Sequence, residues 1–169
     1  MKKNFKKGKL IWITGLSGSG KSLIAKKLKN KIESNNETFF LINGDDLRKI
    51  FKLKKYDKKS RLNYAYSYSF LCKKLTDQGI NVIIAVVAMF HEVRKWNRLN
   101  IKNYHEIYIK TPINLIKKRN KKKLYLSKKI NVVGKDIKAE YPKQSDQTVK
   151  NNYKNDIDKI VNKLLIKIN

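Results

Sequence analysis

A chain of 169 residues with 41% hydrophobic side chains is long enough for one domain with a substantial core, and it is too apolar for a disordered chain. Its formal net charge of +28 is typical of proteins that bind nucleic acid or anionic membranes. The lysines, however, are spread along the whole chain, and arginine occurs only at positions 48, 61, 94, 98 and 119. Nucleic-acid binding is therefore disfavoured, although such a charge would attract small anionic substrates.

The single cysteine, Cys72, excludes an internal disulfide and favours a location in the reducing cytoplasm. Its apolar neighbours at helical spacing predict a buried, inert thiol. The apolar stretch that follows the basic residues 1–9 is too short for a signal peptide, and the longest apolar run, 82–90, is too short to span a bilayer. We therefore expect no membrane partner.

The first two predicted elements enclose the most informative motif of the chain. An apolar run over 10–13 predicts a buried central strand, and apolar residues at helical spacing predict a helix over 21–33. Between them, GLSGSGKS fits the pattern GxxxxGK[ST] of a phosphate-binding loop. An ordinary glycine-rich turn before a helix is the alternative. The predicted donor-binding residues are Gly15, Leu16, Ser17, Gly18, Ser19, Gly20, Lys21 and Ser22.

Each part of this loop has a physical role in binding a nucleoside triphosphate. Glycines let backbone N–H groups wrap around an anion, and the start of the helix adds the positive end of its dipole. Lys21 would reach the β- and γ-phosphates, and the Ser22 hydroxyl would ligate Mg²⁺. ATP and Mg²⁺ are therefore the predicted cofactors, whereas the loop does not identify the acceptor of the phosphate.

A second buried strand, predicted over 39–42, leads to the acceptor side. It ends in a polar loop over 43–46, at the carboxyl end of a strand, where open α/β sheets bind ligands. Asp45 would orient or deprotonate the attacking hydroxyl there. The alternative is helix capping, which suits Asp46 better because it directly precedes a helix predicted over 47–53. Arg48 in that helix and Arg61 in the next are predicted to hold anionic groups, with a solvated surface as the alternative.

The remaining pattern alternates helices and strands. Helices are predicted over 60–76, 92–99, 112–118 and 155–168, and strands over 80–87 and 106–109. This alternation predicts a single α/β domain over 1–169, a three-layer phosphate-loop NTPase fold whose parallel sheet carries helices on both faces. The lysine-rich segment from Arg119 to about residue 142 is predicted to be a mobile lid that closes over ATP. A solvated lysine run is the alternative. His91 and His105 are expected to be packing or surface residues, and no cluster suggests zinc.

At these residues the chain resembles the adenylylsulfate kinases, phosphate-loop kinases that phosphorylate the ribose 3′-hydroxyl of adenylyl sulfate. The loop over 15–22 is the family's own version, and NGDDLR over 43–48 resembles its Asp-Gly-Asp-x-x-Arg motif. The stretch RNKKKLY over 119–125 resembles the family's lid, and Gly134 with 140–142 resembles the end of that lid. The resemblance implies that Asp45 is the base, that Arg48 and Arg61 contact the substrate, and that the protein is a homodimer. It extends the donor site to Arg119 and Lys122 and the substrate site to Leu124.

The departures from the family pattern fall on the acceptor side. Asn43 and Ser60 stand where the family has aspartates, and 88–89 is Ala-Met where it has Ser-Pro. Tyr64 and Tyr66 stand where it has a substrate-binding Asn and Arg, and they are included in the predicted substrate site. Val132 replaces one of two aromatic residues that sandwich adenine, while Tyr56 keeps the other half.

A site that keeps one of the two aromatic residues suits a smaller base than adenine. In these departures the chain resembles a branch of the family, the cytidine diphosphoramidate kinases of Campylobacter capsule biosynthesis. The resemblance implies an ATP-dependent kinase that phosphorylates the 3′-hydroxyl of a small anionic cytidine nucleotide. An ordinary adenylylsulfate kinase is the first alternative, and a basic nucleic-acid-binding protein that uses ATP as a switch is the second.

Overall fold

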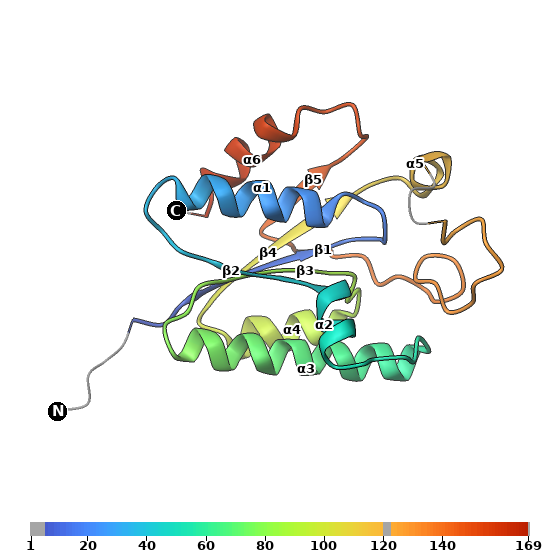
Figure 1. The fold of residues 1–169 in the computed structure, drawn as a ribbon, viewed down its shortest axis with the longest axis horizontal. Coiled ribbons are helices and arrows are strands. Elements are labelled where there is room, and N and C mark those ends of the chain that lie inside the picture. Colours follow the sequence, from blue (N-terminus) through green and yellow to red (C-terminus); the bar gives the residue numbers. More distant parts are fainter. Residues whose placement is uncertain (1–5, 120–122, 169) are drawn as a thin grey trace.

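Five parallel strands form one sheet in the order β2-β3-β1-β4-β5 (Figure 1). The computed structural model describes residues 6–119 and 123–168. The strands are β1 (Lys9–Thr14), β2 (Phe40–Asn43), β3 (Val82–Val86), β4 (Asn103–Lys110) and β5 (Gln147–Lys150). The central strand, β1, pairs with β3 on one side and β4 on the other.

Helices cover both faces of this sheet, so the fold has three layers (Figure 1). Helices α1 (Lys21–Glu33) and α6 (Ile157–Leu165) lie on one face. Helices α3 (Lys58–Asp77) and α4 (His91–Asn100) lie on the other, with the short α2 (Gly44–Ile50) beside them. Helix α5 (Ile113–Arg119) follows β4. The predicted α/β fold with a doubly covered parallel sheet is confirmed.

The two faces of β1 build two separate cores. Ile11 and Ile13 pack toward α1 and α6, whereas Leu10 and Trp12 pack toward α3 and α4, and all four side chains are fully buried. Alternation along a strand sends successive side chains to opposite faces, and a strand buried on both faces therefore reads as a continuous apolar run. This is why the apolar run predicted the central strand correctly.

Most predicted elements are present with boundaries shifted by one to three residues, but the start of α2 was predicted wrongly. Of the expected polar loop over 43–46, Asn43 is the last residue of β2, and residues 44–46 form the first turn of α2, which begins at Gly44. Asn43 is the N-cap residue, so Asp46 is not the cap, and its carboxylate instead accepts a hydrogen bond from Asn43 Nδ2 at 3.1 Å. Both Asp45 and Asp46 lie in the first turn, where the helix dipole favours negative charge.

The strand β5 was not predicted at all. Its sequence, QTVK, is short and mostly polar, and it lies at an edge of the sheet, where it pairs with one strand only.

The structure also bears on the expectations about Cys72 and about membrane-spanning segments. Cys72 is fully buried, and burial raises the pKa of its thiol to about 12. None of the helices in the described part of the chain combines the length and hydropathy needed to cross a bilayer.

Candidate active site

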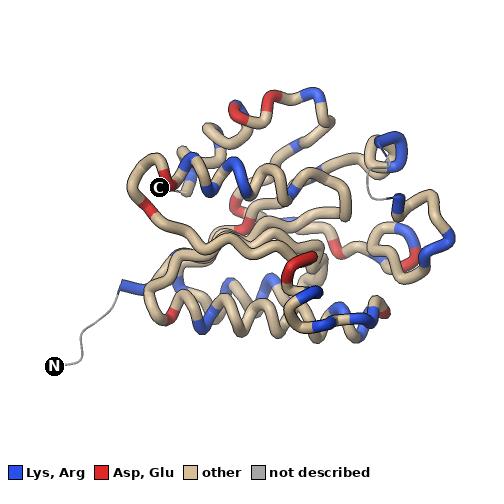
Figure 2. Tube along the Cα trace, in the orientation of Figure 1, with Lys and Arg blue, Asp and Glu red and all other residues tan. Residues whose placement is uncertain are grey.

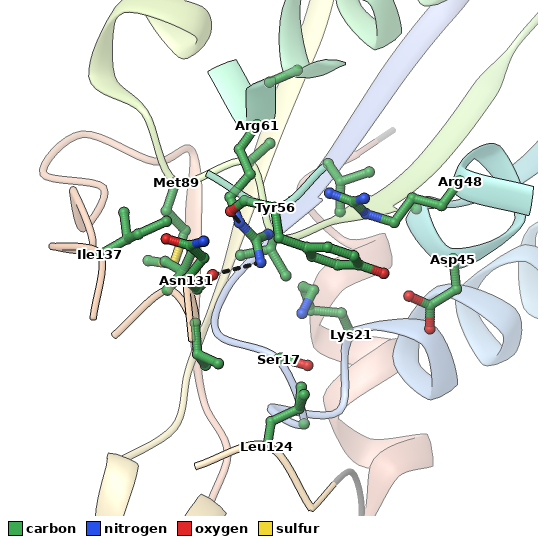
Figure 3. Close-up of a pocket in the computed structure, with 18 of the residues that line it drawn as sticks. Ser17, Lys21, Asp45, Arg48, Tyr56, Arg61, Met89, Leu124, Asn131 and Ile137 are labelled. Carbon is green, nitrogen blue, oxygen red and sulfur yellow. Dashed lines mark hydrogen bonds between the residues drawn. The ribbon is translucent and has the colours of Figure 1, made fainter. Parts of the chain in front are cut away.

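A cavity of about 1010 Å³ lies where the carboxyl ends of the strands meet the phosphate loop (Figure 3). Its volume is at the upper end of the range for small-molecule sites, so it has room for more than a single small ligand. Four regions line it: the phosphate loop with the start of α1, the start of α2, the segment from Tyr56 through the first half of α3, and the irregular chain after α5. The end of β3 and the residues that follow it form the floor.

The phosphate loop has the backbone conformation that anion binding requires. Gly18 and Gly20 adopt φ angles of 84° and 100°, in the left-handed region that favours glycine. Lys21 is the first residue of α1, and its side chain is buried with Nζ donating to the Leu16 carbonyl at 2.8 Å. Ser22, the proposed Mg²⁺ ligand, lines the cavity. Magnesium needs only one or two protein oxygens when substrate phosphates supply others, so this hydroxyl fits the role.

Not every residue of the loop presents its side chain to the cavity. The side chains of Leu16 and Ser19 are buried in the protein, with 3% and 0% of their surface exposed. Leu16 packs in a cluster with Met89, Tyr108 and Ile116. Of the eight predicted residues, Ser17, Gly18, Gly20, Lys21 and Ser22 line the cavity, and we infer that the others serve the loop through their main chain.

Asp45 projects into the same cavity as Lys21 (Figure 3). It comes from the first turn of α2, immediately after the end of β2, whereas Lys21 comes from the loop after β1. The sheet order separates β1 from β2 by β3 alone, so a carboxylate and an ammonium from separate loops face one chamber. A carboxylate that lines the same cavity as a phosphate-binding loop is compatible with the predicted role of Asp45 as a base.

Two arginines converge on the ring of Tyr56. The guanidinium carbon of Arg48 lies 4.1 Å from the ring centroid, and that of Arg61 lies 5.2 Å from it. The Arg48 guanidinium also lies 5.3 Å from the ring of Tyr64, and all four residues line the cavity. Desolvation and the nearby charge of Arg48 lower the pKa of Arg61. A ligand anion placed here would relieve the repulsion between the two guanidinium groups.

The two arginines also hold main-chain carbonyls, which the sequence did not predict. Arg48 Nη1 donates to the Leu53 and Lys55 carbonyls at 3.0 and 3.2 Å. Arg61 Nε donates to the Tyr56 carbonyl at 2.7 Å, and its Nη2 donates to the Asn131 carbonyl at 2.8 Å (Figure 3). A guanidinium has five N–H donors, so these bonds leave others for an acceptor.

The chain from Lys123 to Asp146 contains no helix or strand, yet it is packed against the protein. Its buried residues include Tyr125, Val132 and Ile137, which belong to the same cluster as Leu16 of the phosphate loop. The Tyr125 hydroxyl donates to the Val133 carbonyl at 3.2 Å, which closes the segment on itself. The segment covers one side of the cavity, as a lid would, and its mobility stays a prediction.

The other predicted site residues divide into three groups. Arg119, Tyr64 and Leu124 line the cavity. Tyr66 does not: its hydroxyl donates to Glu92 Oε2 of α4 at 3.3 Å, and its ring stacks on Phe70, one turn further along α3. Lys122 lies outside the described residues.

The sequence analysis did not single out several cationic side chains of the cavity. Lys128, Lys129 and Lys138 line it from the irregular segment. The available signal was the lysine-rich composition of that segment, which does not say which lysines face the cavity. They share the cavity with Arg48 and Arg61, and this excess of cationic side chains suits an acceptor with more than one anionic group.

Sequence comparisons identify relatives along nearly the whole chain. The sequence profile of the family described as adenylylsulphate kinase matches residues 7–150. A cytidine diphosphoramidate kinase from Campylobacter jejuni is 36% identical over 163 residues, covering 94% of this chain and 95% of the relative. An adenylyl-sulfate kinase from Buchnera aphidicola is 33% identical over 162 residues, covering 85% of this chain and 72% of the relative.

Solved structures agree at the level of the fold. The Mycobacterium tuberculosis adenylylsulfate kinase, solved in complex with AMPPNP and adenylyl sulfate, superimposes with a TM-score of 0.86 at 23% identity. The match covers 96% of this chain and 98% of that one. Shikimate kinase from Aquifex aeolicus has a TM-score of 0.60 at 17% identity, with 94% and 95% of the two chains covered. The phosphate loop, the carboxylate beside it and the matched profile lead to one conclusion: the chain is a phosphotransferase that belongs to the adenylylsulphate kinase family.

Proposed function

We propose that the protein transfers the γ-phosphate of ATP to the ribose 3′-hydroxyl of cytidine diphosphoramidate. The observation that carries this proposal is the relative from C. jejuni that bears this activity in its name, since the likeness extends over 94% of one chain and 95% of the other. The phosphate loop and the acceptor-side arginines share one cavity, which is the geometry that direct transfer between two bound nucleotides needs. We expect the reaction to take place in the cytoplasm.

In the proposed reaction the residues of this chain act at both ends of the transferred group. The 3′-hydroxyl oxygen forms a bond to the γ-phosphorus, and the bond from that phosphorus to the bridging oxygen breaks to leave ADP. Asp45 accepts the proton of the hydroxyl, while Lys21 and the loop amides stabilise negative charge on the phosphoryl oxygens. Mg²⁺, held by Ser22 and the phosphates, would neutralise further charge when bound.

The two side chains proposed to face the base differ in kind, one aromatic and one aliphatic, and this difference supports a cytidine nucleotide as the acceptor. Tyr56 offers an aromatic face, whereas Val132, from the irregular segment, is a buried aliphatic side chain in the same cavity. One aromatic and one aliphatic wall suit a single-ring base better than a pair of rings closing on a purine. Arg48 and Arg61 would hold the two phosphorus groups of the acceptor with the N–H donors that their bonds to main-chain carbonyls leave over.

The basic surface is consistent with an anionic small substrate. Lysines and arginines are distributed over both helical layers and the irregular segment (Figure 2). A field of this kind raises the association rate of anionic ligands in general. We therefore assign the charge to substrate attraction and keep duplex binding as an outcome of the test.

A direct assay separates the proposed acceptor from its main rival. Purified protein would be incubated with ATP, Mg²⁺ and either cytidine diphosphoramidate or adenylyl sulfate, and both products would be followed by phosphorus NMR. Conversion of the cytidine compound at a higher kcat/KM supports the proposal. Rapid turnover of adenylyl sulfate alone would refute it, and tight salt-dependent duplex binding without phosphorylation of either compound would favour a nucleic-acid-binding protein.

The oligomeric state needs a separate measurement. The family resemblance implies a homodimer, and one structural neighbour is described as a hexameric adenylylsulfate kinase from Thiobacillus denitrificans, with a TM-score of 0.70. We propose a homodimer, which light scattering of the purified protein would test.

A further inference from the structure

The segment that follows β5 is bonded to the back of the phosphate loop. The Tyr153 hydroxyl donates to the Gly18 carbonyl at 2.9 Å, and Asn151 Nδ2 donates to the Ser19 carbonyl at 2.8 Å. Thr111, which follows β4, donates from its hydroxyl to the same Ser19 carbonyl at 3.2 Å. Two consecutive carbonyls of the loop are therefore held from outside by side chains more than 90 residues away in sequence.

These bonds have a consequence for the inner side of the loop. In a trans peptide the carbonyl and the following N–H point in opposite directions. Because the Ser19 carbonyl is fixed toward Asn151 and Thr111, the N–H of Gly20 is directed the other way, and Gly20 lines the cavity. Backbone N–H groups directed in this way are the donors that bind phosphate oxygens in loops of this class.

The contact between Asn151 and the loop is also tight. A Cβ atom at position 20 would lie 2.6 Å from Asn151 Nδ2, and Gly20 has a φ of 100°. Asn151 is 6% exposed, so it has little freedom to move away. The requirement for glycine at position 20 therefore has two causes here, the backbone conformation and the proximity of Asn151.

Asn151 and Tyr153 form one unit. The Asn151 Oδ1 accepts a hydrogen bond from the Tyr153 backbone N–H at 3.0 Å, while its Nδ2 binds the loop. Tyr153 adopts a φ of 66°, which is uncommon outside glycine and is stabilised by this local bond. The guanidinium carbon of Arg119, a predicted donor-site residue, lies 4.5 Å from the centroid of the Tyr153 ring.

We propose that Asn151 and Tyr153 are positioning residues for the donor nucleotide. Through the carbonyls of Ser19 and Gly18 they hold the phosphate loop in its anion-binding conformation, and through the ring of Tyr153 they hold Arg119 beside it. The inference rests on the donor half of the proposed function and is independent of which acceptor the enzyme uses.

Two substitutions test the unit with little change of shape. Asn151→Asp keeps the acceptor for the Tyr153 N–H but places an anionic oxygen against the Ser19 carbonyl. Tyr153→Phe removes the hydroxyl, with its bond to Gly18 and its hydrogen bond with Arg119, and keeps the ring next to the Arg119 guanidinium. We expect the Kd for a nonhydrolysable ATP analogue with Mg²⁺ to rise about tenfold or more in the first and about threefold in the second, because each loses one hydrogen bond to the loop and the first adds a repulsion.

The matched control is Asn155→Asp, the same substitution in the same connection. Asn155 is exposed, and its Nδ2 donates to the Lys150 carbonyl and not to a carbonyl of the phosphate loop, so its replacement should leave the Kd unchanged. Isothermal calorimetry with the ATP analogue and with adenosine separates the effects: a positioning role weakens binding of the triphosphate, whereas binding of adenosine changes little. Circular dichroism and thermal melting establish which variants are folded.

The outcomes are distinct. Weaker triphosphate binding in folded Tyr153→Phe and Asn151→Asp, with wild-type binding in Asn155→Asp, supports the proposal. Unchanged triphosphate binding in folded Tyr153→Phe, or an equal loss in the Asn155 control, overturns it. If Asn151→Asp does not fold, Tyr153→Phe decides alone. If the wild-type protein does not phosphorylate cytidine diphosphoramidate, the proposed acceptor is refuted, but the measurements of ATP-analogue binding to the variants keep their meaning.

Discussion

Replacing Arg61 by methionine is expected to increase the mobility of residues 123–142, within the irregular segment from Lys123 to Asp146, without unfolding the domain. The arginine spans the cavity: its Nε binds the Tyr56 carbonyl on one side, and its Nη2 binds the Asn131 carbonyl on the other. Only the second bond holds the irregular segment. A partly buried hydrogen bond from a charged donor contributes about 1.5 kcal/mol. Methionine keeps most of the apolar stem, so the loss of this bond should raise the opening equilibrium of the segment about tenfold.

Hydrogen–deuterium exchange measured by mass spectrometry reports this equilibrium directly. Amides of residues 123–142 should exchange about tenfold faster in Arg61→Met, while those of β1 and β3 keep their rates. The matched control is Arg48→Met. Arg48 also donates to two carbonyls, those of Leu53 and Lys55, but neither belongs to the irregular segment. Unchanged exchange in Arg61→Met, or the same acceleration in both variants, would refute the reasoning.

Four further predictions follow from the site and the core. Lys21→Ala should abolish phosphoryl transfer while the far-ultraviolet circular dichroism stays native, and an active variant would contradict the assigned role. Asp45→Asn should lower kcat at least about a hundredfold with little change in ATP affinity, whereas equal losses in both would argue against a base. Gly134→Ala should lower the free energy of unfolding by about 1–2 kcal/mol in urea denaturation, because Gly134 has a φ of 87° and the added Cβ would lie 2.8 Å from Leu16 Cδ2; unchanged stability would show that the segment adapts freely. Cys72, with its pKa raised to about 12, should resist iodoacetamide at pH 8 in the native protein and react after denaturation, and rapid native labelling would contradict its burial.

The phosphate loop was predictable from sequence because the strand, loop and helix that form it are consecutive, whereas the distant side chains that bind its carbonyls were not. The strand β1, the loop over 15–22 and the helix α1 are consecutive, and each has a strong pattern of its own. Burial of β1 on both faces follows from its apolar run, and the glycines mark the backbone conformation directly. Local consistency of this kind is what makes a motif readable from one sequence.

The acceptor half was less predictable because its contacts join distant segments. Nothing near Arg61 in the sequence indicates that its guanidinium reaches Asn131, 70 residues away. Tyr66 was expected to bind substrate because of its place in a motif, yet the packing of α3 on α4 sends it to Glu92. The strand β5 was missed because QTVK has no apolar run, and its pairing with β4 is decided by tertiary structure.

The cavity is lined partly by the loop after a buried strand and partly by chain without regular structure, and these two parts differ in how readily their residues can change. One wall is the phosphate loop, which follows the central strand β1. Every residue of that strand from Leu10 to Thr14 is inaccessible to solvent, so substitutions in the strand would destabilise the fold. Another wall comes from the irregular segment, where exposed lining residues such as Lys128 and Lys129 can be exchanged at little cost in stability, unlike the buried Val132 and Ile137. Exchanges among those exposed side chains can therefore change which acceptor fits the cavity while the phosphate loop stays intact.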